Sequence, residues 1–304
     1  MTRHVTTIEE VGPEGLRELC ALARDGDVRS LVDVPVALVF ERPSLRTRAS
    51  SSVAVSDLGG HPTFFTDEEI GIDARESAED VARALAAYFP VAALRVREHR
   101  VLERMRAAAG ERLSIINLLS NEAHPTQAIA DVLTLADHFS GGDVAGLAGL
   151  EVAYIGDATN VARSLSVALR LVGAHVRVAA PDRYRLAHGG VEDATRVESG
   201  SLRELRDPVE GVRGADVVYT DAWVSMGAEA QTAQRRHDLA DFRVTTELLA
   251  YASTSVVFLH CLPAHRGDEV RDDVLDGPRS LIWEQAAHRR SAMRGALAWV
   301  RGGA

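Results

Sequence analysis

The chain contains no lysine, because all 34 of its basic residues are arginine. Without a side-chain amine, Schiff-base chemistry, covalent attachment of pyridoxal phosphate and the lysine of a nucleotide-binding P-loop are excluded. Cysteine is almost as scarce, since only Cys20 and Cys261 occur and they form no C-x-x-C pair. Neither a disulfide framework nor a structural zinc site is therefore indicated, and we interpret Cys20 as a core residue of a helix.

The sequence also lacks long apolar runs. No stretch approaches the ~20 apolar residues that a membrane span requires. The opening M-T-R-H-V-T-T-I-E-E has no apolar core of the kind found in signal peptides. We therefore expect a cytoplasmic protein. A net charge of −10 argues against a general nucleic-acid surface, because phosphate backbones require clustered positive charge.

Short apolar runs rich in β-branched residues alternate with helical patterns along most of the 304-residue chain. Strands of this kind are typical of parallel sheets that helices cover on both faces. The predicted strands are 36–40, 91–96, 114–119, 151–155, 175–180, 216–220 and 255–260, and a turn followed by a short strand is predicted over 58–65. We expect an α/β protein with two doubly wound parallel-sheet domains and an interdomain active-site cleft at the carboxyl ends of the strands.

A glycine-rich stretch at 140–149, S-G-G-D-V-A-G-L-A-G, separates the two series of strands and predicts a domain boundary. We predict a first domain over 1–138, a second over 139–283, and a C-terminal helix over 284–304 that packs back on the first domain. The acidic stretch 66–76 carries few structure-forming signals and is predicted to be an exposed loop.

The first of these strands leads into F-E-R-P-S-L-R-T-R, where Pro43 stops the strand and Ser44 opens a helix. A helix N-terminus has unpaired N–H groups and a partial positive charge, so anions bind there. The first turn adds two hydroxyls and two guanidinium groups, from Ser44, Thr47, Arg46 and Arg48. This donor set fits the oxygens of a phosphate, and we interpret the loop as a phosphate site.

Further polar residues occur inside or after other predicted strands. Arg95 lies within the short apolar strand 91–96, where a buried charge requires an anion or a carboxylate partner. His124 and Gln127 follow the strand 114–119, and their H-P-T-Q pattern fits either a helix cap or a ligand site. Asn160 precedes a helix and is predicted to be its N-cap.

Two later loops carry sharper patterns. T-D-A-W-V-S-M-G places Asp221 and Ser225 on one loop after a strand, where a carboxylate suits an ammonium group or caps a turn. H-C-L-P places His260 beside Cys261, which is not metal-ligand spacing on a strand because neighbouring side chains point to opposite faces. Asp182 follows the strand 175–180 and keeps a nicotinamide cofactor as a distant alternative.

Taken together, S-L-R-T-R, H-P-T-Q, D-x-W-x-S-M-G and H-C-L-P resemble the ornithine branch of the aspartate/ornithine carbamoyltransferase family across nearly the whole chain. The S-M-G loop and H-C-L-P separate that branch from the aspartate enzymes. The resemblance implies transfer of the carbamoyl group of carbamoyl phosphate to an amine, L-ornithine in that branch, without a metal or an organic cofactor. It also implies a homotrimer, with the active site near a subunit boundary.

The resemblance also implies a role for individual residues. Those carried over as carbamoyl-phosphate ligands are Ser44, Leu45, Arg46, Thr47, Arg95, His124, Gln127, Cys261, Leu262 and Arg289. Those carried over as ligands of the amino acid are Asn160, Asp221, Ser225 and Met226. Catalysis would fall to the groups that face the developing charge or orient the amine, namely Arg46, Thr47, Arg95, His124 and Cys261.

The sequence departs from the family pattern in the residues that support these groups. Ser51 and Ser52 stand where the family has Phe-Glu, and Thr159 replaces the first residue of an Asn-Asn pair. E-Q-A-A-H-R replaces D-E-A-E-N-R around Arg289, and the loop around Gly71 has no glutamine that could reach the phosphate. Two alternatives therefore remain open: a divergent paralogue that carbamoylates a different amine in a specialised pathway, and a non-catalytic binding protein on the same fold.

Overall fold

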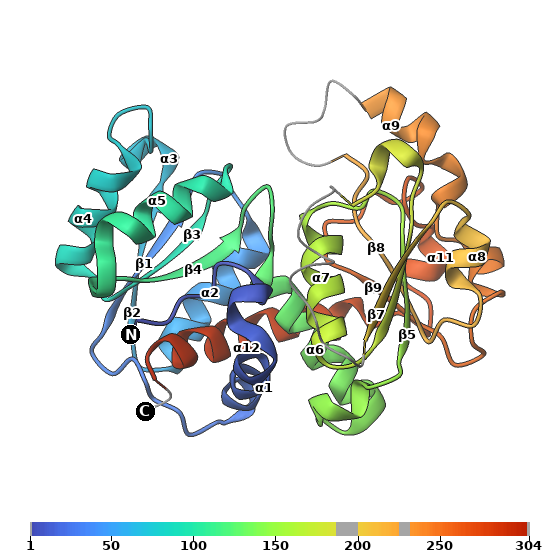
Figure 1. Ribbon diagram of the computed structural model, residues 1–304, viewed down its shortest axis with the longest axis horizontal. Coiled ribbons are helices and arrows are strands. Elements are labelled where there is room, and N and C mark those ends of the chain that lie inside the picture. Colours follow the sequence, from blue (N-terminus) through green and yellow to red (C-terminus); the bar gives the residue numbers. More distant parts are fainter. Residues whose placement is uncertain (1, 187–199, 225–231, 303–304) are drawn as a thin grey trace. The chain divides into compact units, whose positions relative to one another are not determined.

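The computed structural model describes residues 2–186, 200–224 and 232–302. By its internal contacts the chain forms two compact units. Unit 1 consists of Met1–Leu133 and Ala287–Ala304, and unit 2 consists of Thr134–Ala286. Each unit contains one parallel sheet with helices on both faces (Figure 1), which confirms the predicted α/β fold class. Among the described residues, no helix combines the length and the apolarity that crossing a membrane requires.

The sheet of unit 1 has four parallel strands in the order β2-β1-β3-β4. They are β1 (Pro35–Phe40), β2 (His61–Thr66), β3 (Val91–Arg95) and β4 (Ser114–Leu119). The chain runs from β1 outward to β2 and then returns to place β3 on the other side of β1. In parallel sheets, ligands bind at the carboxyl ends of the strands where the order reverses in this way. The register pairs Phe40 with Arg95 there.

The helices of unit 1 cover both faces of this sheet. They are α1 (Ile8–Arg24), α2 (Leu45–Asp57), α3 (Asp67–Ile70), α4 (Ala78–Tyr88) and α5 (His99–Ala109), with η1 (Gly110–Arg112), most of α6 (Pro125–Ser140) and α12 (Ile282–Val300) from Ala287 onward. Figure 1 shows α4 and α5 on the same face. There Val81, Leu85 and Leu102 pack on Val39 and Leu94 of the strands in a core that excludes water.

Two helix starts follow the local signals in the sequence. The hydroxyl of Ser44 accepts a hydrogen bond from the Thr47 amide at 3.4 Å, and that of Ser77 accepts one from the Asp80 amide at 3.1 Å. The predicted helix start at Ser44 is therefore confirmed, and Ser77 caps α4 in the same way. The prediction of a loop over 66–76 is wrong in its first half, because Thr66 and Glu69 form a capping box that starts α3. A four-residue helix is too short to leave an apolar period in the sequence.

The sheet of unit 2 has five parallel strands in the order β7-β6-β5-β8-β9. They are β5 (Glu151–Ile155), β6 (His175–Ala179), β7 (Ser201–Leu205), β8 (Val217–Thr220) and β9 (Val257–His260). The strand order reverses between β5 and β8, so the ligand-binding position of this sheet is at their carboxyl ends. The edge strand β7 was not predicted, because S-L-R-E-L is largely polar and has no apolar run.

The helices of unit 2 flank this sheet, with α7 on one face and α8 and α11 on the other (Figure 1). They are α7 (Asn160–Leu171), α8 (Pro208–Val212), α9 (Thr232–Asp238), α10 (Thr246–Leu249) and α11 (Asp272–Leu275), with η2 (Val144–Leu147), η3 (Asp182–Tyr184) and η5 (Ala240–Phe242). The predicted N-cap of α7 is wrong by one residue. Thr159 has extended backbone angles and its hydroxyl accepts from the Val161 amide, so Asn160 is the first helical residue.

Candidate active site

Arg289 lies at the centre of the polar cluster in unit 1. Its Nη1 donates to Oε1 of Gln127 and contacts Nε2 of His124 at 3.3 Å. Its Nη2 donates to the Thr47 hydroxyl at 3.3 Å, and Ser44 donates to the same hydroxyl at 3.0 Å. The guanidinium therefore joins the N-terminus of α2 to the first turn of α6. Five residues carried over from the family resemblance lie together in this part of the structure.

Arg46 and Leu45 lie in the first turn of α2, beside this cluster. The Arg46 guanidinium makes no hydrogen bond or ion pair to the described part of the chain, and the Leu45 side chain is 80% exposed. Arg48 instead lies over the ring of Phe64, with its guanidinium carbon 4.4 Å from the ring centroid. Arg46 is thus the first-turn arginine whose donors remain available to an anion, and Leu45 can contribute only its backbone there.

His124 is buried and stays neutral. Burial holds its pKa well below the usual value, and the positive charges of Arg289 and Arg95 lower that pKa further. Arginine can only donate, so Nε2 of His124 accepts from Arg289, and the neutral ring carries its proton on Nδ1. The imidazole can therefore donate a hydrogen bond to a substrate oxygen without carrying a charge.

Glu41 links two loops of unit 1 and was missed in the sequence. It follows β1 directly, is 8% exposed, and accepts from the backbone N–H of Arg97 at 2.5 Å. The Arg97 guanidinium in turn donates to Asp67 at 2.6 Å. Glu41 thus ties the loop after β1 to the loop after β3, which begins beyond the buried Arg95. A carboxylate one residue past a buried strand was a signal that could have identified it.

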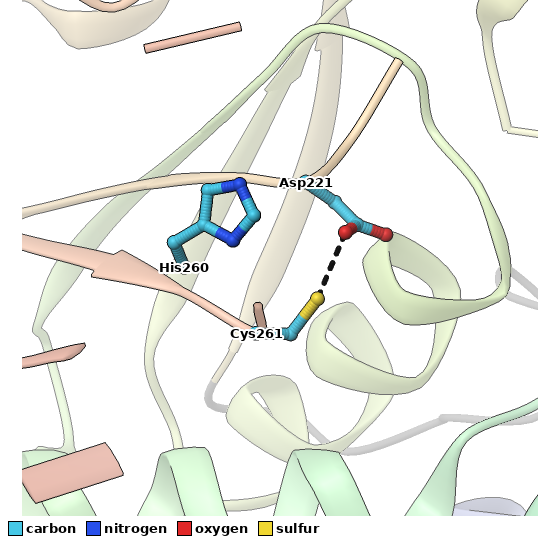
Figure 2. A group of neighbouring side chains, drawn as sticks. All are labelled: Asp221, His260 and Cys261. Carbon is cyan, nitrogen blue, oxygen red and sulfur yellow. Dashed lines mark hydrogen bonds between the residues drawn. The ribbon is translucent and has the colours of Figure 1, made fainter. Parts of the chain in front are cut away.

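Asp221 and Cys261 form the centre of the polar cluster in unit 2 (Figure 2). The Cys261 thiol donates to Oδ1 of Asp221 at 2.8 Å, the bond that is dashed in Figure 2. The Thr159 hydroxyl donates to Oδ2 at 3.4 Å. These residues come from the ends of β8, β9 and β5, the neighbouring strands at the switch point of the sheet. A carboxylate at this position can hold a cationic amine. Asn160 lies one residue beyond Thr159, at the start of α7.

The prediction that His260 and Cys261 face away from each other is wrong. β9 ends at His260, so side-chain alternation no longer applies to Cys261, and ligand atoms of both residues and Asp221 lie within 4.8 Å of one another. His260 nevertheless has no lone pair to offer a metal in this arrangement. Its Nδ1 accepts from the Leu262 amide at 2.8 Å, and its Nε2 lies 3.1 Å from Glu269.

Arg235 connects three loops of unit 2 and was also missed in the sequence. It lies on α9 and donates to the Asp157 carboxylate and, at 2.9 Å, to the carbonyl of Trp223. Its guanidinium carbon lies 5.2 Å from the ring centroid of Tyr184. Burial raises the pKa of Asp157 to about 6 although Arg235 acts in the opposite direction. No local pattern marks Arg235, since it lies on a short polar helix.

Leu262, Ser225 and Met226 are the remaining predicted site residues of unit 2. Leu262 follows Cys261 in unit 2, with a left-handed backbone at φ 57°. Ser225 and Met226 lie outside the described residues, so their assignment to the amino acid stays a prediction. Cys261 and Leu262 were predicted as carbamoyl-phosphate ligands, and the structure groups Cys261 with Asp221, a predicted ligand of the amino acid.

Comparisons with known protein families match both halves of the chain. Residues 3–137 match the model described as "Aspartate/ornithine carbamoyltransferase, carbamoyl-P binding domain". Residues 148–300 match the model described as "Aspartate/ornithine carbamoyltransferase, Asp/Orn binding domain". The cluster around Arg289 lies mainly in the first match, and the Asp221 cluster lies in the second.

Individual relatives agree with these matches. The ornithine carbamoyltransferase of Clavibacter michiganensis is 40% identical, over 99% of each chain. The solved structure of the Pyrococcus furiosus ornithine carbamoyltransferase is 37% identical, with a TM-score of 0.93 over 100% of this chain and 98% of that one. The Thermus thermophilus enzyme is 36% identical, with a TM-score of 0.86 over 99% of each chain. The chain therefore belongs to the aspartate/ornithine carbamoyltransferase family.

Proposed function

We propose that this protein transfers the carbamoyl group of carbamoyl phosphate to the side-chain amine of L-ornithine, giving L-citrulline and phosphate. One observation carries the proposal. Each sheet of this family member presents a polar cluster at its switch point, one rich in arginine around Arg289 and one built on the Asp221 carboxylate and the Cys261 thiol. These charges match a phosphate and an amine, the groups that the two substrates present.

The cluster of unit 1 suits carbamoyl phosphate. The N-terminal amides of α2 and the Arg46 guanidinium supply donors to the phosphate. Arg95, the Thr47 hydroxyl and the Nδ1–H group of neutral His124 supply donors to the carbamoyl oxygen. Gln127 and Arg289 complete the set. Negative charge grows on that oxygen and on the phosphate during transfer, and fixed donors lower the barrier by stabilising it.

The cluster of unit 2 suits the amino acid. The carboxylate of Asp221 and the thiol of Cys261 orient the amine, while Asn160, Ser225 and Met226 complete the amino-acid site. Attack by the neutral amine forms the N–C bond and breaks the C–O bond to phosphate. The amine loses one proton, which leaves with the phosphate. No covalent intermediate with the protein is required.

Several broader features belong to the same proposal. Residues 1–138 would form the carbamoyl-phosphate domain, 139–283 the amino-acid domain and 284–304 a helix that completes the first. Leu45 and Leu262 would contribute backbone groups. We further propose a homotrimer that acts in the cytoplasm, in arginine biosynthesis. One relative, from Pyrococcus furiosus, is named "Ornithine carbamoyltransferase, anabolic", and it is 39% identical over 278 residues.

The test is the release of phosphate and ureido product from carbamoyl phosphate with a panel of amines that includes ornithine. Arg46→Ala should lower kcat/KM by about 10²- to 10³-fold, because it removes a donor to developing charge. Arg17→Ala is the matched control, since Arg17 is an exposed arginine of α1. Turnover with another amine but not with ornithine would favour a specialised paralogue. Carbamoyl phosphate binding without turnover would favour a binding protein.

A further inference from the structure

His260 holds the turn that carries Cys261. Its side chain is fully buried at the end of β9, and its Nδ1 lies 2.8 Å from the backbone nitrogen of Leu262. A backbone N–H can only donate, so Nδ1 is unprotonated and accepts this bond. The proton of the neutral ring is then on Nε2, which lies 3.1 Å from Oε1 of Glu269. The two contacts together specify one tautomer and one orientation of the ring.

Glu269 is anchored independently of His260. Its side chain is completely buried, and the same Oε1 accepts from the backbone N–H of His265 at 2.5 Å. Its backbone carbonyl accepts from the amide of Val244 at 2.9 Å. The carboxylate therefore keeps a fixed position next to the turn and can fix the orientation of the His260 imidazole through Nε2. No substrate role is needed to explain why it is buried there.

The backbone is restrained on both sides of Cys261. The backbone N–H of His260 donates to Oε1 of Gln285 at 3.0 Å, and Gln285 donates to the hydroxyl of Tyr219 at 3.0 Å. On the other side, Leu262 has φ 57°, a left-handed conformation that is costly for a residue with a Cβ. The bond from its N–H to His260 offsets part of that cost. Cys261 is thereby aimed at Asp221, which its thiol reaches at 2.8 Å.

We propose that His260 and Glu269 are positioning residues of the acceptor site, which fix the Cys261 thiol and the Leu262 backbone without touching substrate. This inference deepens the proposed carbamoyl transfer and, for its effect on rate, rests on it. Nδ1 of His260 is the atom that acts on the turn. Glu269 acts through His260, by keeping the proton on Nε2 so that Nδ1 remains an acceptor.

Two amide substitutions at His260 distinguish the roles of its two ring nitrogens. His260→Asn places an amide oxygen where Nδ1 lies and keeps an acceptor for the Leu262 amide, but it loses the donor to Glu269. His260→Gln places an amide nitrogen where Nε2 lies and keeps that donor, but it loses the acceptor. At the other partner, Glu269→Gln retains an acceptor oxygen for the ring, whereas Glu269→Leu removes it.

The direct readout is the rate at which iodoacetamide alkylates Cys261, measured by mass spectrometry without substrates. Cys20 does not interfere, because it is 1% exposed and burial raises its pKa to about 12. His260→Gln should label about tenfold faster, since a thiol released from Asp221 is more accessible. Glu269→Leu should raise the labelling rate of Cys261 by a similar factor. His260→Asn and Glu269→Gln should stay within about threefold of the wild-type rate, because both keep the relevant acceptor.

Steady-state rates with ornithine should follow the same order, with kcat lowered about 10²-fold in His260→Gln and least in His260→Asn. His175→Ala is the control, since it removes an imidazole at the amino end of β6 in the same sheet. Wild-type labelling and turnover in His260→Gln would overturn the proposal. Equal losses in the asparagine and glutamine variants, with equal falls in Tm, would overturn it too. If the wild-type protein transfers no carbamoyl group, the proposed function fails, and the labelling contrast still decides the positioning role.

Discussion

The polar clusters of the two units occupy equivalent places in their sheets but carry opposite charge. In unit 1 the switch point between β1 and β3 gathers arginines around hydroxyls and a neutral histidine. In unit 2 the switch point between β5 and β8 gathers the carboxylates of Asp157 and Asp221, with Arg235 bonded to Asp157. The same sheet topology thus supports one cluster rich in arginine and one cluster built on carboxylates. The side chains on the loops, not the strand order, determine which one forms.

The clusters also differ in how they are built. In unit 1 a single guanidinium, that of Arg289, reaches partners on two other helices. In unit 2 the contacts run between loops that follow neighbouring strands. One of these loops is also held by His260, which contacts Glu269. One variant should therefore disrupt most of the first cluster, whereas the second should lose its groups one at a time.

The largest effect is expected from Arg289→Met, which removes the contacts to Thr47, Gln127 and His124 together. We expect kcat/KM to fall by about 10³-fold, because a buried charged donor is lost and its partners are left without it. Arg290→Met is the control, since its neighbouring guanidinium pairs with Asp57 at an exposed site, where ion pairs contribute under about 1 kcal/mol. Steady-state kinetics of both variants measures the difference. Equal losses would contradict the central role of Arg289.

Asp221→Asn should have the next largest effect, confined to the acceptor. The amide keeps an acceptor for Cys261 but removes the charge that we propose holds the amine, so kcat/KM for ornithine should fall about 10²-fold. Carbamoyl phosphate binding, followed by calorimetry, should stay within about threefold. Asp216→Asn at the amino end of the same strand serves as the control. A comparable loss of carbamoyl phosphate binding would show that the two clusters are not separable.

Asp157 should make unit 2 relatively more stable in acid. Burial raises its pKa to about 6 from an ordinary value of 3.8, so the native state binds this proton more tightly than the unfolded state does. Its contribution is full below about pH 4 and is lost as the pH rises through 6, a change of roughly 3 kcal/mol. Asp157→Asn should abolish this dependence in urea unfolding between pH 4 and 7. An unchanged slope would contradict the raised pKa.

His124 should have the opposite effect on the pH dependence of stability in unit 1. Its lowered pKa means that the unfolded state binds the proton more tightly, so stability is lost as the pH falls below the ordinary value of 6.5. In the working range the ring stays neutral, so the pH profile of kcat should show no step from His124 near 6.5. Arg289→Met should raise this pKa, because it removes one of the two charges that depress it. NMR titration of the imidazole would detect either result.

Local signals predicted the parts of the fold that depend on neighbouring residues. The runs at Pro35–Phe40, Ser114–Leu119 and Glu151–Ile155 form strands because continuous apolar, β-branched segments suit a sheet covered on both faces. Ser44 caps α2 because its hydroxyl reaches an amide three residues ahead. The prediction failed at β7 and α3, because polar composition or short length left no apolar periodicity that could indicate a strand or a helix.

The sequence by itself determined where most of the strands end and where α2 begins, and so which polar residues stand at the carboxyl ends of those strands. It did not determine their partners. Arg289 meets His124 across 165 positions, and Arg235 meets Asp157 across 78. Such pairs leave no pattern in one sequence, because their contact depends on how the strands are ordered and how helices pack on the sheet. Tertiary structure alone made His124 neutral, placed Cys261 against Asp221, and set Glu269 behind His260.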